Sequence, residues 1–245
     1  MLDPTKRFSN RVENYVKYRP PYPPDIVGLL EADCTLAPAS VIADVGSGTG
    51  ILSEMFLKHG NRVFGVEPNR EMRAAGDKLL AKYPKFSSID ATAEATTLVN
   101  ASVDFVTVGQ AFHWFDREKS RAEFERILKP GGWVVLTWNG FRVETSPLNN
   151  AYQQLVLRYG TDYQEVRREI LGCDVESFYA PGGCRRAGFE FRARVPRWFF
   201  GGGIAGPPGA VAGWQHSQMR PRSSRKSRPM APSAPAGRAA RRNRD

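Results

Sequence analysis

The sequence predicts an α/β fold, in which a doubly wound, Rossmann-like parallel sheet carries helices on both faces. Two observations support this prediction. Between residues 41 and 139, apolar runs of strand length alternate with amphipathic runs of helix length, a pattern typical of parallel sheets joined by right-handed crossovers. The run "IADVGSGTGIL" (residues 42–52) also joins a strand to a helix through three glycines. In such folds, ligands bind at the carboxyl ends of the strands.

The order of the elements follows from these apolar runs and from the residues that end them. Strands are expected at residues 40–46, 62–68, 86–95, 102–110 and 133–139. Helices are expected at residues 51–60, 69–83, 116–132 and 146–160. Gly60 is typical of a helix C-terminus, and Asn69 is typical of an N-cap. Before the first strand, prolines interrupt a short amphipathic helix, and a second helix begins at Asp25.

The chain is predicted to divide into three parts. Residues 1–40 form an N-terminal helical segment, residues 41–185 form the sheet domain, and residues 186–245 form a basic low-complexity tail. Most of the net charge of +10 comes from the tail. Residues 1–184 carry 21 Lys and Arg against 23 Asp and Glu, whereas residues 185–245 carry 14 against 2. The overall charge therefore says nothing about what the sheet domain binds.

The tail is rich in Gly, Pro, Ser, Ala and Arg and poor in large apolar residues, so we expect it to be disordered. A GC-rich gene that is read out of frame also yields such a composition. Our hypothesis is a frameshift near residues 185–200, which translation of the gene in its other two frames would test. The alternative is a basic arm that binds nucleic acid, but aromatic side chains are scarce there and nucleic acid is not the expected partner.

Cysteine usage and hydropathy indicate the compartment. Cys34, Cys173 and Cys184 are odd in number and widely spaced, which favours reduced thiols over a disulfide framework or a zinc site. No run approaches the roughly 18 apolar residues of a membrane span, and the first residues lack the apolar stretch of a secretory signal. We therefore expect a cytoplasmic protein that needs no metal and no membrane. The oligomeric state stays open.

The spacing of the glycines in the turn after the first strand distinguishes two kinds of nucleotide-binding site. The dinucleotide fingerprint is G-x-G-x-x-G, whereas Gly46, Gly48 and Gly50 are spaced G-x-G-x-G. Asp44, two residues earlier, is awkward for a pyrophosphate but suits a cationic amino group. Glu67 ends the next strand, where an acid usually bonds ribose hydroxyls. This pattern disfavours a nicotinamide oxidoreductase.

These residues resemble the cofactor site of the class I S-adenosylmethionine-dependent methyltransferases. "YRPPYPP" and "QAFHWFD" are similar to the small-molecule subgroup called methyltransferase type 11, which includes trans-aconitate-type carboxylate methyltransferases. The resemblance implies S-adenosylmethionine as cofactor and a loop after the third strand that meets the adenine, with Asp90 as a competitor there. The cofactor-binding residues it implies are Asp44, Gly46, Ser47, Gly48, Gly50, Glu67, Ala93, Glu94 and Gln110.

The resemblance also bears on the acceptor side and on the sheet edge. In this family the N-terminal segment covers the active site as a lid, so the substrate candidates are Tyr15, Tyr18, Arg19, Tyr22 and Trp114. Arg19 is able to clamp a carboxylate through two hydrogen bonds. Related sheets end in an antiparallel pair of strands, for which this chain offers at most "FEFRARV" (residues 189–195). We therefore expect the C-terminal strands to be missing and residues 133–139 to form an open edge.

Catalysis by this chemistry requires positioning more than a reactive side chain. A sulfonium methyl is already activated, so the protein brings a nucleophile into line and excludes water. His113, just past the fourth strand, is the candidate general base; the alternative is that it only shapes the cofactor wall together with Trp114. The predicted function is methyl transfer to a small-molecule acceptor, with a carboxylate as one candidate. The alternatives are a cofactor-binding remnant without turnover and a nucleic-acid-binding module.

Overall fold

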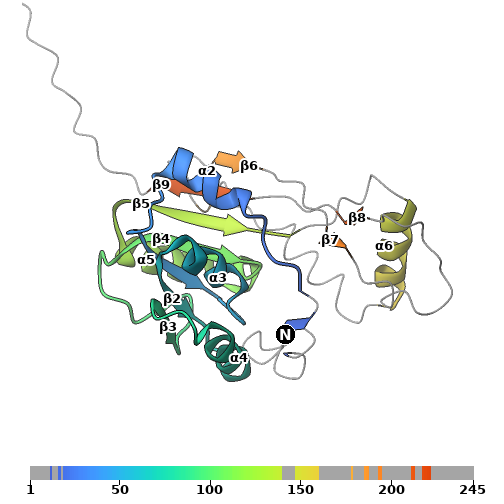
Figure 1. Ribbon diagram of the computed structural model, residues 1–245, viewed down its shortest axis with the longest axis horizontal. Coiled ribbons are helices and arrows are strands. Elements are labelled where there is room, and N and C mark those ends of the chain that lie inside the picture. Colours follow the sequence, from blue (N-terminus) through green and yellow to red (C-terminus); the bar gives the residue numbers. More distant parts are fainter. Residues whose placement is uncertain are drawn as a thin grey trace, which may run out of the picture.

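The computed structural model describes residues 12, 16–17, 19–139, 147–159, 178, 185–187, 193–194, 211–212 and 217–221. Five parallel strands form its centre: β1 (Val41–Val45), β2 (Arg62–Val66), β3 (Phe86–Ile89), β4 (Val103–Gly109) and β5 (Leu128–Thr137). Within the described residues they lie in the order β3-β2-β1-β4-β5 (Figure 1). The chain thus winds outward from β1 in both directions, which confirms the predicted doubly wound α/β fold.

Helices cover both faces of this sheet. They are α2 (Asp25–Cys34), α3 (Ile51–His59), α4 (Arg70–Leu80) and α5 (Arg117–Ile127); α6 (Pro147–Tyr159) follows β5. One apolar cluster joins α2 and α3 to the sheet through residues such as Leu30, Phe56 and Ile42. The other joins α5 to the opposite face through residues such as Phe124 and Val106. Successive side chains of a strand point to opposite faces, so the continuous apolar runs supply both clusters.

The helix termini follow local rules with one exception. Asn69 is the N-cap of α4 and its side chain accepts a hydrogen bond from the Met72 amide, as expected. The predicted helix over residues 116–132 is too long, because α5 ends at Ile127 and β5 begins at Leu128. Leu128 has extended backbone angles and pairs with Val103 across a register shift in β4. Tertiary pairing therefore ends the helix before Pro130 does.

The far edge of β5 differs from the expectation of an open strand. Strand β9 (Ser217–Pro221) pairs antiparallel with β5, and β6 (Arg185–Ala187) pairs with β9 in turn (Figure 1). The expectation that β5 forms an open edge is therefore wrong at these residues, whereas the predicted disorder of the tail stays a prediction. Of the strand predicted from "FEFRARV", the structure describes residues 193–194, which form β7 (Ala193–Arg194) and pair with β8 (Val211–Ala212) in a separate sheet.

The backbone explains this difference. Ser217–Pro221 contains a single large apolar residue, Met219, and its pairing with β5 uses main-chain groups that almost every residue carries. The frameshift hypothesis and the three-part division of the chain stay predictions. Most of residues 186–245 lie outside the described residues. Among the helices that the structure does describe, none has the length and apolar character needed to cross a bilayer.

Candidate active site

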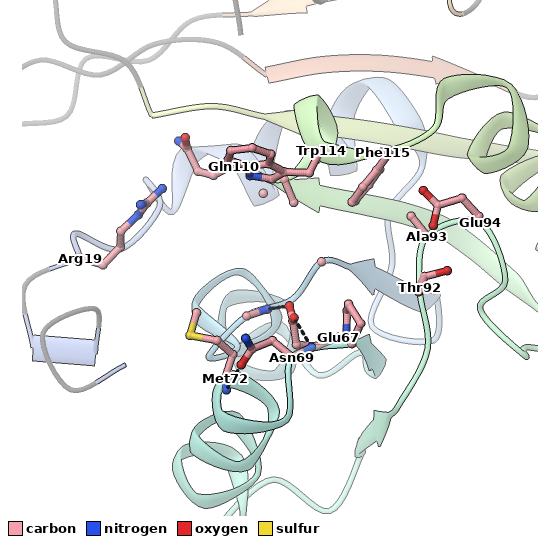
Figure 2. Close-up of a pocket in the computed structure, with 15 residues that line it drawn as sticks. Arg19, Glu67, Asn69, Met72, Thr92, Ala93, Glu94, Gln110, Trp114 and Phe115 are labelled. Atoms are coloured by element: carbon pink, nitrogen blue, oxygen red, sulfur yellow. Dashed lines mark hydrogen bonds between the residues drawn. The ribbon is translucent and has the colours of Figure 1, made fainter. Parts of the chain in front are cut away.

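A cleft opens at the carboxyl ends of β1, β2 and β4, with a volume of about 240 Å³. Its walls come from the loops that follow each of the first four strands and from one residue of the N-terminal segment (Figure 2). β1 has β2 on one side and β4 on the other, so the loops that leave β1 and β4 diverge and leave room for a ligand. Eight of the predicted site residues line the cleft: Arg19, Gly46, Gly48, Glu67, Ala93, Glu94, Gln110 and Trp114.

The three glycines of the loop after β1 differ in what requires them. All three have positive φ angles, of 69°, 57° and 82° for Gly46, Gly48 and Gly50. A Cβ atom on Gly46 would lie 2.6 Å from Ala111 Cβ, and one on Gly50 would overlap Leu80. A Cβ on Gly48 would meet only the flexible end of Met72, at 3.3 Å. Gly46 and Gly50 are therefore fixed by packing, whereas Gly48 keeps the floor of the cleft open.

Glu67 stands at the end of β2 with its carboxylate at the cleft wall (Figure 2). One carboxylate oxygen accepts the Gly48 amide at 2.8 Å, and the other accepts the Asn69 amide at 2.9 Å. Burial raises the pKa of Glu67, although these two amides oppose that shift. Each carboxylate oxygen has a further lone pair, so Glu67 is able to accept two more hydrogen bonds from a ligand.

Asp44 lies at the foot of the glycine loop and is completely buried. Its carboxylate accepts hydrogen bonds from the hydroxyl groups of Ser53 and Thr107. Burial raises the pKa of Asp44 from 3.8 to about 6, and the two hydroxyl groups oppose the shift. Asp44 does not line the main cleft but a smaller cavity beside it, together with Ser47, Tyr22 and Arg19.

The loop after β3 forms the end of the cleft away from Arg19 (Figure 2). Ala93 is buried there, and the Glu94 carboxylate accepts the Asp116 amide at 2.9 Å. Asp90, the competitor for this position, is instead paired with Arg73 at 2.7 Å and does not line the cleft among the described residues. Thr92, Ala93 and Glu94 are thus the residues of this loop that a ligand in the cleft would meet.

The segment after β4 forms the upper wall in Figure 2. Gln110 has a φ angle of 61°, which is uncommon outside glycine. Its amide donates to the Thr137 carbonyl at 2.9 Å, and its side chain donates to the Asn139 carbonyl at 3.2 Å. These bonds tie the end of β4 to the end of β5. They hold Gln110 against the cleft in a conformation that costs about 1–3 kcal/mol.

The short helix η1 (Phe112–Trp114) gives His113 and Trp114 different positions relative to the cleft. Trp114 lines the cleft, whereas His113 is not among the described residues that do, although the two rings lie 4.5 Å apart. The role of His113 as general base therefore stays a prediction with no cleft contact behind it. Of the other predicted residues, Tyr22 lines the small cavity and Gly50 lines neither. Tyr15 and Tyr18 lie outside the described residues.

Some lining residues were not predicted from the sequence. Met72 belongs to α4, and Phe115 follows η1; both side chains face the cleft. Phe115 stands inside the quoted run "QAFHWFD", so its position beside Trp114 was an available signal. Nothing in the sequence indicates which face of α4 carries Met72 to the ligand rather than to the core.

Comparison with known proteins agrees with this architecture. Residues 43–136 match a family described as methyltransferase domain. An uncharacterized methyltransferase of Mycobacterium tuberculosis is 37% identical over 137 residues, which cover 56% of this chain and 54% of that protein. An uncharacterized methyltransferase-like protein of Schizosaccharomyces pombe is 32% identical over 64% of this chain and 60% of its own length. The matches thus span a little over half of these relatives.

Solved structures show the same fold. A candidate S-adenosyl-L-methionine-dependent methyltransferase of Methanococcus maripaludis superposes with a TM-score of 0.61 at 17% identity, covering 91% of this chain and 95% of that one. At this identity the likeness concerns the fold alone. The narrower likeness to trans-aconitate-type enzymes stays a prediction. The family match over residues 43–136, the curated relatives and the shared fold together support the resemblance of this chain to the class I S-adenosylmethionine-dependent methyltransferases.

Proposed function

We propose that the protein binds S-adenosylmethionine in the cleft and transfers its methyl group to a small-molecule acceptor. The observation that carries the proposal is Glu67 with two spare lone pairs beside the open floor at Gly48. A ribose offers two adjacent hydroxyl groups to such a carboxylate. When bound, the cofactor would supply a methyl group already activated on a sulfonium.

The residues present fit the parts of this cofactor. Glu67 would accept the ribose hydroxyl groups, and the loop with Ala93 and Glu94 would border the adenine beside the ring of Phe115. Gly48 leaves space that a side chain would fill. A pyrophosphate fits less well, because the two carboxylates of Asp44 and Glu67 stand next to the glycine loop. The same chemistry argues against a nicotinamide dinucleotide.

The side chains that line the cleft favour a methyl acceptor that does not have to lose a proton. Among the described residues that line the cleft, the titratable side chains are Arg19, Glu67 and Glu94. Both carboxylates already accept backbone amides, and an arginine is not a base near neutral pH. An acceptor that is itself an anion requires no base. This favours a carboxylate acceptor within the proposed class, placed beside Gln110 and Trp114.

Calorimetry on the full chain tests the proposal. S-adenosylhomocysteine should bind, and NAD should give no heat of binding. Glu67→Ala should weaken the binding of S-adenosylhomocysteine by about 1.5–3 kcal/mol, because charge-assisted hydrogen bonds to the ribose are lost. It should also lower the melting temperature, since the amides of Gly48 and Asn69 lose their acceptor.

The matched control is Glu125→Gln on α5, which is exposed and paired with Arg121 and should leave binding unchanged. Tight NAD binding without a response to S-adenosylhomocysteine would overturn the proposed function. Unchanged affinity in Glu67→Ala would leave Glu67 a purely structural residue. Methyl transfer from labelled S-adenosylmethionine into a metabolite mixture then separates an active enzyme from a binding remnant.

A further inference from the structure

An ion pair on α5 contacts the loop that follows β3, although neither of its residues is among the described residues that line the cleft. Arg126 donates two hydrogen bonds of 2.7 Å to the Glu123 carboxylate, one to each oxygen, a geometry that fixes both side chains. Glu123 is only 8% exposed. Hydrogen bonds from Arg126 lower the pKa of Glu123, so its carboxylate is charged at neutral pH. Since Phe124 and Ile127 bury the same helix against the sheet, the pair has a fixed position.

This ion pair holds the loop on both sides of a single turn. The Glu123 carboxylate accepts hydrogen bonds from the amide and the hydroxyl group of Thr96, at 2.7 and 2.5 Å. Arg126 donates to the Leu98 carbonyl at 2.7 Å. Thr97, between them, has a φ angle of 62°, which residues other than glycine adopt only where their surroundings hold them in place. The ion pair therefore keeps this turn in a conformation that the turn alone would not favour.

The turn begins directly after the part of the loop that lines the cleft. Residues 92–94 line the cleft (Figure 2), and the Ala95 amide donates to the Thr92 carbonyl at 3.3 Å, which closes a tight loop. The chain leaves this loop through Thr96, which is completely buried. The Glu94 carboxylate in turn accepts the amide of the N-cap residue of α5. α5 thus contacts the loop through its first residue and through its last turn, and it determines where residues 92–94 lie.

The position of residues 92–94 matters because a purine is recognised by the order of donors and acceptors along its edge. Adenine carries an amino group, which donates, where hypoxanthine carries a carbonyl, which accepts. The Glu94 carboxylate and the Thr92 hydroxyl group are both able to accept from an amino group, whereas a carboxylate has no proton to donate to a carbonyl. Hydrogen bonds weaken beyond about 3.2 Å, so a shift of about 1 Å in the loop would remove this preference.

We propose that the Glu123–Arg126 pair positions the loop after β3 and thereby sets the preference of the cleft for adenine over other purines. The inference rests on the proposed function, because this loop borders an adenine only if S-adenosylmethionine binds in the cleft. Glu123 and Arg126 are positioning residues, since they act through Thr96 and Leu98. Their effect is therefore expected in the choice between bases.

Calorimetry on the full chain with two ligands tests this proposal. S-adenosylhomocysteine and S-inosylhomocysteine differ only in the base, which is adenine in the first and hypoxanthine in the second. The unmodified protein should bind S-adenosylhomocysteine about 10- to 100-fold more tightly. Glu123→Gln keeps the shape but replaces one acceptor oxygen with a donor, so either Thr96 or Arg126 loses its partner. It should weaken S-adenosylhomocysteine about 10-fold and S-inosylhomocysteine less than about twofold.

A milder variant and a control on the same helix accompany this measurement. Thr96→Val removes only the hydroxyl group that bonds to Glu123 and keeps the ion pair, so it should fold and reduce the preference for adenine about threefold. This variant decides the question if Glu123→Gln does not fold. Glu125→Gln, which is exposed and paired with Arg121, is the matched control and should leave both affinities unchanged.

The ratio of the two affinities separates positioning from a merely structural role. Partial unfolding lowers both apparent affinities by the same factor and leaves the ratio unchanged. Equal losses for the two ligands, or an unchanged preference in both variants, would therefore contradict the inference. An unmodified protein that binds the two ligands equally well would also contradict it, while still agreeing with the proposed function. If the unmodified protein binds neither ligand, the proposed function itself is wrong.

Discussion

Replacing Asp44 with asparagine is expected to stabilise the ligand-free protein by about 2–3 kcal/mol at pH 8. Burial raises the pKa of Asp44 from 3.8 to about 6, so the folded state favours the protonated carboxyl group. The unfolded chain releases that proton at a lower pH. The stability contributed by this group is therefore full below about pH 4 and falls as the pH rises to about 6. An asparagine keeps the shape and never ionises.

The same variant should weaken the binding of S-adenosylhomocysteine about 10- to 100-fold, because Asp44 borders the small cavity beside the cleft and its carboxylate suits the cationic amino group of this ligand. Urea denaturation at pH 8 and pH 5 measures the stability, and calorimetry measures the affinity. At pH 5 the stability gain should shrink to about half, because the native carboxyl group is then mostly protonated. A variant that is less stable than the unmodified protein at both pH values would show that burial does not disfavour the Asp44 carboxylate.

Gly50→Ala is expected to destabilise the fold by about 3–5 kcal/mol, much more than the same change at Gly48. The alanine at residue 50 would have to adopt a φ angle near 82°, and its methyl group would overlap Leu80. Leu80 is almost completely buried and has no space into which to move. At Gly48 the backbone penalty of about 1–2 kcal/mol remains, but the neighbour is the adaptable end of Met72.

Gly48→Ala and Gly50→Ala should also differ in their affinity for a ligand. Gly48 lines the cleft and Gly50 does not, so Gly48→Ala should lose affinity for S-adenosylhomocysteine even though it stays folded. Gly50→Ala, where it is folded in the absence of urea, should retain most of that affinity. Urea denaturation with and without S-adenosylhomocysteine measures both quantities. Equal stability losses for the two changes would contradict the packing argument at Leu80.

Local pattern was enough to predict most of the sheet and part of the site. Val103–Gly109 is rich in Val and Phe, with Asp104 and Thr107 between them, and most of it is buried; such a strand-forming run between polar segments appears directly in the sequence. Glu67 and the glycine loop follow strands, so their position at the carboxyl edge came with the fold. These predictions succeeded because residues close in the sequence determine them.

The remaining features depend on contacts between distant segments. Asp44 was expected to hold a ligand group; its carboxylate borders the small cavity beside the cleft and also accepts hydroxyl groups from α3 and β4, which its place in the sequence does not indicate. His113 and Trp114 are neighbours, and only the turn of η1 decides which of them lines the cleft. Strand β9 is held by main-chain pairing with β5, which leaves almost no mark on the sequence of residues 217–221.

The position of β9 in the sequence also determines how late during synthesis the edge of β5 is covered. All five parallel strands are complete by Thr137, but the strand that covers β5 ends at Pro221, 84 residues later. At about 5–20 residues per second, translation needs roughly 4–17 s to add those residues. During this interval the edge of β5, with Trp133 and three aliphatic residues after it, has no partner from its own chain. Competition from other nascent chains is therefore concentrated in the seconds before the last strand emerges.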